Sequence, residues 1–293
     1  MAASRSGSVS LRYRLPAEDL RAYVSAYHFV TVGSTPDGPI EDLFYPGWAN
    51  VRFTLSGNGW TARIGDAANA PVPAAALFGV TSRAAMVRVE RGELVGAGLT
   101  PLGWARLFGR DASAFADRIT PLGCLLADEA EHLLAQLRAV EGDAAWAEVL
   151  DGWFAQRLAQ RPEPDELVLT VHRIFMDAEL EQVEEAAARL SISPRHMSRV
   201  AQRLFGLTPK LLLRRQRFMR TLMELRKPDP RPWVERLDAR YYDQSHFVRD
   251  CHRFLGMSPS RFFSLPRPIL EASTTARTRL LGQGAQSLHP PYR

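Results

Sequence analysis

The sequence predicts two domains: a mixed β-barrel or sandwich with trailing helices, followed by an all-α domain. Three observations support this. A length of 293 residues suits about two domains of ordinary size. Short apolar segments broken by turn residues fill residues 43–99, which is typical of a small antiparallel barrel or sandwich. Beyond residue 165 only helical periodicity is found, and it repeats at an offset of 50 residues.

The first half is expected to begin with short strands joined by hairpin turns such as residues 56–59. The expected strands are Leu43–Tyr45, Asn50–Leu55, Trp60–Ile64, Ala75–Val80, Ala85–Glu90 and Leu94–Leu99. From Pro101 the period changes toward 3.6, which predicts helices at Leu102–Phe108, Ala127–Val140 and Ala144–Ala159. The last two helices carry apolar stripes, which are equally consistent with packing on the strands and with pairing with a second subunit.

Two prolines and polar neighbours in residues 161–166 indicate a linker. We therefore expect a first domain over 1–160, the linker, a helical domain over 167–268, and a disordered tail over 269–293.

Composition excludes several classes of protein. The fractions of 46% hydrophobic and 24% charged residues are those of a soluble globular protein. No apolar run approaches the roughly 18–20 residues of a membrane span, and residues 1–15 lack the apolar core of a signal peptide. We expect a cytoplasmic protein without a membrane partner. Cys124 and Cys251 form neither a disulfide framework nor a C-x-x-C motif, and both are expected to be small buried side chains.

The net charge of +5 is unevenly distributed. Residues 1–160 hold 14 basic and 17 acidic side chains, whereas residues 165–270 hold 19 and 13. The segment from Arg189 to Arg220 contains nine basic residues and no acidic one. Because such a segment repels itself unless a polyanion neutralises it, the pattern favours nucleic acid as the partner.

The repeat in the helical half has the pattern of two helix-turn-helix units. Residues 203–209 align with 253–259, and upstream His196 aligns with His246. In the first unit, Gln182–Leu190 is the first helix, and Ser193-Pro194 provides an N-cap and a first-turn proline for the second. Gly206 suits a left-handed cap that ends this second helix.

The second helix of each unit separates an apolar stripe from a polar one. In the first unit the inward side chains are Met197, Val200, Ala201 and Leu204. The second unit comprises a first helix over Pro232–Arg240 and a second that begins at Asp243, buries Phe247, Cys251 and Phe254, and exposes His246, Arg249, Asp250 and Arg253. A helix over Lys210–Leu225 joins the units, and a separation of about 34 Å would place both second helices in successive major grooves.

The segments 193–199, 206–209, 242–247 and 256–262 resemble the tandem helix-turn-helix module of AraC/XylS-type bacterial transcription regulators. The resemblance covers about residues 167–265 and implies sequence-specific DNA binding, mainly by the first recognition helix. Outward arginine, glutamine and serine side chains are suited to reading base edges. The expected DNA contacts are Arg195, His196, Ser198, Arg199, Gln202, Arg203, Lys210, Arg214, Arg217, Gln244, Ser245, His246, Arg249 and Arg253.

The second unit departs from the family pattern at three positions. Arg240 stands where a turn glycine is usual, Arg236 replaces the inner-face alanine of the first helix, and Cys251 replaces a large aromatic. We therefore expect this unit to be less well packed and to act mainly as a phosphate clamp.

Residues 1–160 fit the effector-sensing or dimerising domain that such regulators commonly carry. Candidates to line a ligand pocket are Tyr45, Trp48, Phe53 and Trp60, with core packing as the alternative. Because this half has only His28 and His132 and no G-x-S-x-G motif, neither a metal, a cofactor nor an enzyme activity is expected. The alternative, an enzyme or repair protein fused to this DNA-binding module, needs a cysteine cluster where only Cys124 occurs. Expected partners are double-stranded DNA, a small-molecule effector, a second copy of the chain and RNA polymerase.

Overall fold

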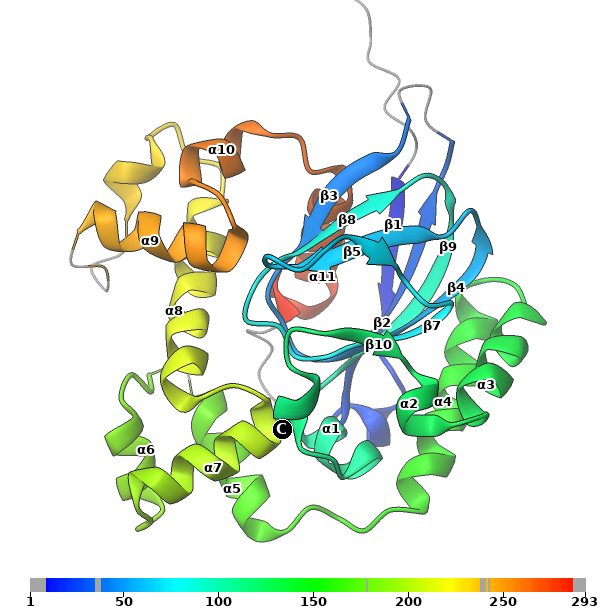
Figure 1. Ribbon diagram of the computed structural model, residues 1–293, viewed down its shortest axis with the longest axis horizontal. Helices are drawn as coiled ribbons and strands as arrows, with labels where there is room; N and C mark the ends of the chain where they lie inside the picture. The colour runs from blue at the N-terminus through cyan, green and yellow to red at the C-terminus, as the bar shows by residue number, and fades with distance from the viewer. Residues whose placement is uncertain (1–8, 35–37, 178, 238–240, 242, 287–293) are drawn as a thin grey trace, which may run out of the picture.

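Two antiparallel β-sheets form the first domain, and helices form most of the remainder (Figure 1). The computed structural model describes residues 9–34, 38–177, 179–237, 241 and 243–286. One sheet has the strand order β1-β2-β9-β4-β7-β10 and the other β3-β8-β5-β6. The strands are β1 Val9–Arg14, β2 Val24–Val32, β3 Ile40–Phe44, β4 Asn50–Gly57, β5 Trp60–Ile64, β6 Ala70–Pro71, β7 Ala75–Phe78, β8 Ala85–Val89, β9 Gly92–Leu99 and β10 Ile119–Pro121. The sheets face each other without closing into a barrel.

The alternation of side chains in the six-stranded sheet divides the first domain into layers. Tyr27 on β2 and Phe53 on β4 point to the outer face, where they join an apolar core shared with helices. The neighbouring residues His28 and Arg52 point the other way and line a cavity between the sheets. Phe53 was expected to line the ligand pocket, and this expectation is wrong because residues one position apart on a strand face opposite sides.

The helices that follow the strands cover the outer face of the six-stranded sheet (Figure 1). They are α1 Pro101–Phe108, α2 Gly123–Leu126, α3 Glu129–Arg138 and α4 Asp143–Ala159. The apolar stripes of α3 and α4 are buried there: Leu137 and Leu150 are fully buried, and Phe154 stacks on Tyr27 with ring centroids 6.1 Å apart. Of the two alternatives left open by the sequence, these stripes pack on the sheet.

Four strands were not predicted: β1, β2, β10 and the two-residue β6. β2 is buried along nearly its whole length, so it lacks the polar alternation that marks a half-exposed strand. β1 carries Arg12 and Arg14 and lies at the sheet edge, and β10 has three residues that are ordered by pairing with β7. Their sequences alone carry little strand signal because the sheet partner supplies the stabilising contacts.

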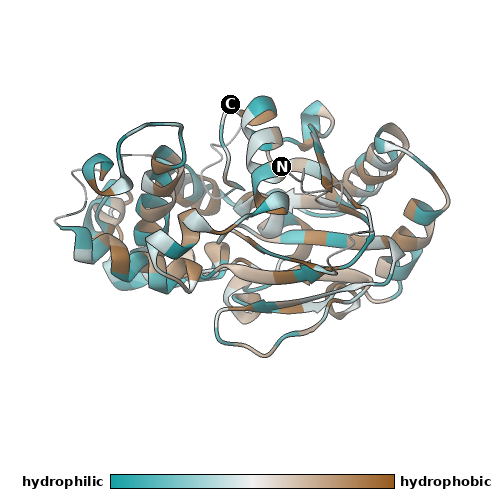
Figure 2. Ribbon diagram, turned by 90° about the horizontal axis from the view of Figure 1, so that it is seen from above, coloured by the Kyte–Doolittle hydropathy of each residue, from teal (hydrophilic) through white to brown (hydrophobic). Residues whose placement is uncertain are grey.

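The second domain is helical, and its ribbons alternate between polar and apolar residues as amphipathic helices do (Figure 2). Its helices are α5 Glu166–Met176, α6 Val183–Arg189, α7 Pro194–Phe205, α8 Pro209–Leu225, α9 Gln244–Leu255 and α10 Pro259–Ser264. The expected helix Pro232–Arg240 is instead a single 3-10 turn over Trp233–Arg236, with Leu237 extended. Positions 238–240 and 242, and with them the Arg240 turn, lie outside the described residues.

The segment expected to be a disordered tail contains a helix, α11, over Pro268–Leu281. It packs against β1 and β3 on the side of the first domain that faces the helical domain (Figure 1). Its N-terminus is held by the buried carboxylate of Asp42, whose Oδ2 accepts hydrogen bonds from the backbone N–H of Ile269 (2.7 Å) and Leu270 (3.1 Å). The expectation of disorder over this helix is therefore wrong, because contacts with distant residues order it.

Candidate nucleic-acid interface and interior cavity

The two helix-turn-helix units are built with the same caps. Ser193 Oγ accepts a hydrogen bond from His196 N–H at 3.2 Å, and Asp243 Oδ1 accepts one from His246 N–H at 2.7 Å, so α7 and α9 begin identically. Both end at a glycine in the left-handed region, Gly206 with φ 72° and Gly256 with φ 73°. The repeat at an offset of 50 residues is thus a repeat of three-dimensional structure.

The outward face of α7 is polar along its N-terminal half. Arg195 and Arg199 are exposed, whereas Met197 and Ala201 are fully buried beneath them. A shallow surface hollow is lined by polar and charged side chains or their caps: Ser193, Arg195, His196, Ser198, Arg199 and Gln202. Within the described residues no acidic side chain forms an ion pair with Arg195 or Arg199. These two cations are therefore available to an external anion.

The outward face of α9 is similarly polar. Gln244, Ser245, Arg249 and Arg253 are exposed, and Phe247, Cys251 and Phe254 are buried as expected. Asp250 was expected to be exposed, and this is wrong: its side chain is completely buried. Its carboxylate accepts hydrogen bonds from Arg214 Nε at 2.7 Å and from Tyr241 Oη at 2.9 Å. Asp250 therefore fastens α9 to α8.

Three arginines of the basic segment on α8 lie in different environments. Arg214 is partly exposed and paired with Asp250, and Arg217 lies 5.3 Å over the Tyr241 ring with Nη2 3.4 Å from His246 Nε2. Arg215 is fully buried. Arg203 and Lys210, by contrast, are exposed, and no ion pair with a described residue involves them. The sequence could not separate these environments because helical periodicity does not say which faces meet another domain.

Arg236 explains how the second unit tolerates a charge at an apolar position. Its side chain turns to the C-terminal end of α8 and donates to the carbonyls of Glu224 (2.7 Å) and Leu225 (3.1 Å). It also lies 3.4 Å from the carboxylate of Asp229. A cation at this end of a helix satisfies carbonyls that have no intrahelical partner. Trp233 meanwhile packs on Phe247 with ring centroids 5.5 Å apart, so the apolar contact with α9 is made by another residue.

One loop of the first domain, residues 79–84 between β7 and β8, touches both units. Its Val80 packs against Gly206 at the end of α7, where a Cβ would lie 2.2 Å from Val80 Cγ1. Its Thr81 carbonyl accepts from Arg215 Nη1 on α8 at 2.8 Å, and its Ala84 N–H donates to the Phe254 carbonyl on α9 at 2.7 Å. We call this segment the β7–β8 loop.

Arg215 is the central contact between the domains. It donates to the carbonyls of Gly47 (3.1 Å) and Thr81 (2.8 Å), and its guanidinium lies 4.4 Å over the Trp48 ring. Burial lowers the pKa of Arg215 to about 9, because the charged form loses its hydration.

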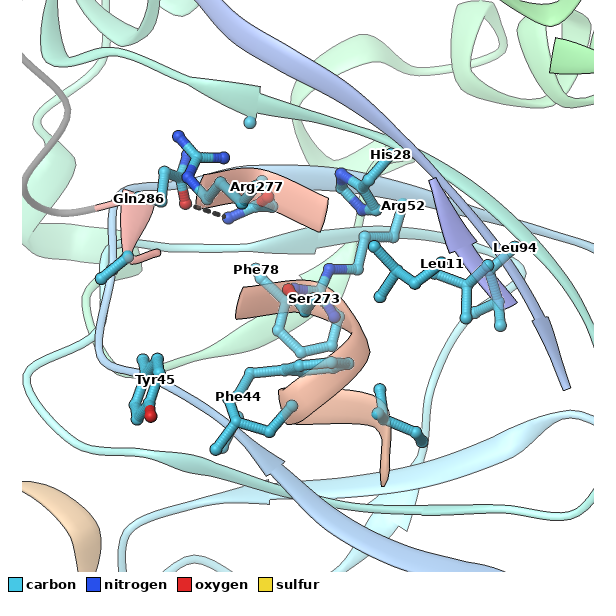
Figure 3. A pocket seen from close by; sticks show the side chains of 18 of the residues that line it. Leu11, His28, Phe44, Tyr45, Arg52, Phe78, Leu94, Ser273, Arg277 and Gln286 are labelled. Atoms are coloured by element: carbon cyan, nitrogen blue, oxygen red, sulfur yellow. Dashed lines mark hydrogen bonds between the residues drawn. The ribbon is translucent and has the colours of Figure 1, made fainter. Parts of the chain in front are cut away.

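A cavity of about 100 Å³ lies between the two sheets (Figure 3). Tyr45, Trp48 and Trp60, three of the four residues expected to line a pocket, do line it. No signal in the sequence pointed to its two arginines, Arg52 on β4 and Arg277 on α11, because pocket residues from distant segments share no motif. α11 forms one wall, with Ser273 and Arg277 directed at the cavity (Figure 3).

Searches for metal-binding groups and membrane-spanning helices covered the part of the chain that the structure describes. No group of three or more histidine, cysteine, aspartate or glutamate side chains is arranged to hold a metal ion there. None of the helices among these residues is long and apolar enough to cross a membrane. Cys251 is buried as expected, but Cys124 is exposed, so the expectation for Cys124 is wrong.

One comparison with known proteins, with family models, agrees with the geometry of the helical domain. A family model described as a helix-turn-helix domain matches residues 186–264. ToxT from Vibrio cholerae O395 is similar over 88% of this chain and 97% of its own, at 8% identity and a TM-score of 0.43. Wild-type ToxT of strain SCE256 with a bound unsaturated fatty acid is similar over 89% and 96%, at 9% identity and a TM-score of 0.42. The AraC-like transcriptional activator CuxR is similar over 73% and 87%, at 14% identity and a TM-score of 0.30. A comparison with curated proteins found no match.

The matched domain and the paired, identically capped helices define the class. Residues 186–264 form a helix-turn-helix domain of the AraC type. A helix-turn-helix domain of this type implies DNA binding by this part of the chain.

Proposed function

We propose that the protein reads a specific DNA sequence with α7 and α9 and that a small molecule in the first domain controls this reading. The observation that carries the first part is the exposed polar stripe on the N-terminal half of α7, above a buried apolar stripe. Arginine forks there can bond guanine, and Ser198 and Gln202 can bond other base edges. His196 lies at the same hollow.

The remaining expected contacts divide into base and phosphate groups. Arg203 near the end of α7 and Lys210 at the start of α8 are exposed cations and suit phosphate oxygens. Gln244, Ser245, His246, Arg249 and Arg253 on α9 would contact the adjacent groove or its phosphates. Arg217 lies beside His246, and its charge adds to this side of α8. α7 and α9 lie near opposite ends of α8, an arrangement that supports binding to successive grooves (Figure 1).

The β7–β8 loop supports control by the first domain. It contacts the ends of both proposed recognition helices and the middle of α8, which sets their separation. Gly79 and Thr81 of the same loop also line the interior cavity. An occupant of the cavity therefore has a short path of contacts to both recognition helices, and it can shift their spacing if it binds one loop position better than another.

We further propose the domain assignment that follows from these contacts. Residues 1–160 form the sensing domain, residues 161–166 the linker, and residues 167–268 the DNA-binding domain. α11 lies beyond the DNA-binding domain but belongs structurally to the sensing domain. A second copy of the chain and RNA polymerase are proposed partners, because regulators of this class act at promoters.

The experiment that tests this function is selection of genomic DNA fragments by the purified full-length protein, followed by sequencing. The expected result is enrichment of one motif with two half-sites about 10 base pairs apart. The same selection with a metabolite mixture should change the enrichment. Failure to enrich any sequence would overturn the proposal of specific DNA reading.

A further inference from the structure

The charged side chains among the described residues that line the interior cavity are all positive. Its described lining includes two arginines, Arg52 and Arg277, and no aspartate or glutamate. His28 also lines it, and burial together with the neighbouring arginine charges holds the pKa of His28 well below its ordinary value, so this histidine is neutral at physiological pH. The lining therefore carries two positive charges and no negative one.

Arg52 has no anionic partner among the residues that the structure describes. Its guanidinium is stacked between the rings of Phe44 (4.0 Å) and Phe78 (4.3 Å), which fixes its position. Among the described residues none accepts a hydrogen bond from its Nε, which is buried. Its enclosure lowers its pKa to about 10, since the charge is poorly hydrated there. Buried charges in proteins are ordinarily paired, so this arrangement is incomplete without an acceptor.

The rest of the lining sets the size and polarity of an occupant. Aliphatic and aromatic side chains surround the arginine: Leu11, Val30, Val89, Leu94, Trp60 and Ile269. Tyr13 and Ser273, joined at 2.8 Å, and Gln286 offer further hydrogen-bonding groups at the α11 wall. A dry cavity of about 150 Å³ holds benzene, so about 100 Å³ suits a slightly smaller body.

We propose that the cavity binds a small organic carboxylate, whose anionic group bonds Arg52 and whose apolar body of a few carbon atoms contacts the aliphatic lining. This inference rests on the proposed function, since it names the chemical class of the effector. Because Arg277 and Ser273 come from α11, which follows the second helix-turn-helix unit directly in the chain, the occupant would contact the helix that leads back to that unit.

The test compares ions with neutral molecules of the same shape. Binding of isovalerate and butyrate to the full-length protein is measured by calorimetry and thermal shift, alongside isovaleramide and butyramide. The carboxylates should bind at least tenfold more tightly than the amides. Equal binding of acid and amide, or no binding of either carboxylate, overturns the proposal, and this comparison needs no variant.

Two variants then locate the anion. Arg52→Met keeps the length of the side chain and removes its charge, and it should lose at least tenfold in carboxylate affinity. Arg279→Met, at an exposed arginine of α11, should not change that affinity. Unchanged binding in Arg52→Met overturns the assignment to Arg52. None of these measurements involves DNA, so a failure here is distinct from a failure to select a DNA motif.

Discussion

Asp250 on α9 forms an ion pair with Arg214, which belongs to the basic segment of residues 189–220. Asp250 is fully buried and accepts from both Arg214 and Tyr241, so its negative charge depends on the arginine. Arg214 is thereby the residue of the basic segment whose replacement should affect folding before it affects DNA.

Arg214→Ala should lower the free energy of unfolding by about 2 kcal/mol, because it leaves a buried carboxylate without its cation. Loss of one partner of a fully buried pair costs about 3–5 kcal/mol, and the partial exposure of Arg214 reduces this. Urea unfolding measures the change. The double variant Arg214→Met with Asp250→Asn should recover most of the loss, and no recovery would show that the ion pair is not the cause.

Arg199→Ala should weaken binding to the selected DNA site by about 1–3 kcal/mol and relax the preference at one base pair, as expected for a lost bidentate contact. Lys210→Ala should weaken binding to selected and random DNA alike and reduce the salt slope by about one. Titrations with both DNAs at several salt concentrations distinguish the two roles. Equal losses on both DNAs for both variants would contradict the assignment of α7 as the base-reading helix.

His172 on α5 gives the protein a predictable response to acid. It is almost completely buried, and burial lowers its pKa from about 6.5 to about 4. Since the folded pKa lies below the unfolded one, the unfolded state binds the proton first, and the stability present above about pH 6.5 is lost as the pH falls through about 4. Relative to His172→Gln, the wild type should lose up to about 3 kcal/mol more between pH 7 and 4. Parallel pH profiles for the two proteins would show that His172 does not titrate in this way.

At the scale of elements, the two helix-ending glycines form a matched pair. Gly206 and Gly256 have the same left-handed φ, but a Cβ at Gly206 would meet Val80 and the Ala112 carbonyl, whereas a Cβ at Gly256 has no neighbour within 4 Å. The end of α7 is therefore pressed against the first domain, and the end of α9 is open at this point.

Gly256→Ala should lower the free energy of unfolding by about 1 kcal/mol, the cost of a left-handed alanine. Gly206→Ala should lose about 2–4 kcal/mol, because overpacking against Val80 adds to the same backbone cost. Chemical unfolding of the two variants side by side measures the difference. Equal losses would indicate that α7 and the first domain separate easily.

At the scale of the whole molecule, α11 ties the far end of the chain to the first domain. This contact depends on Asp42, which accepts hydrogen bonds from the backbone N–H groups of residues 227 and 228 positions further along the chain. Together with Arg215 it joins the domains at two places, so movement of the DNA-binding units is restrained at α8 and beyond α10.

Asp42→Ala should release α11, since two backbone N–H groups at its start lose their acceptor. Limited proteolysis should cut within 266–286 several-fold faster than in the wild type. Glu41→Ala is the control, because Glu41 is the exposed neighbour of Asp42 and does not contact α11 in any described hydrogen bond. Cleavage at the same rate in both variants would show that other contacts hold α11.

The helix-turn-helix units could be predicted from sequence signals, including their caps at Ser193 and Asp243, their left-handed glycines and the buried faces of α7 and α9. These features follow from signals within one or two helical turns, such as a capping side chain or apolar residues three and four apart. Structure that is set by residues close together in the chain can therefore be predicted from the sequence.

Three features became evident only in the folded protein. Residues 268–281 form a helix, Asp250 and Arg215 are buried, and Arg52 and Arg277 face one cavity. Each of these depends on residues far apart in the chain. Periodicity identifies which side of a helix or strand is buried, but not which part of the chain covers it. The covering part determines whether a charged side chain is exposed, joins two domains or faces a cavity.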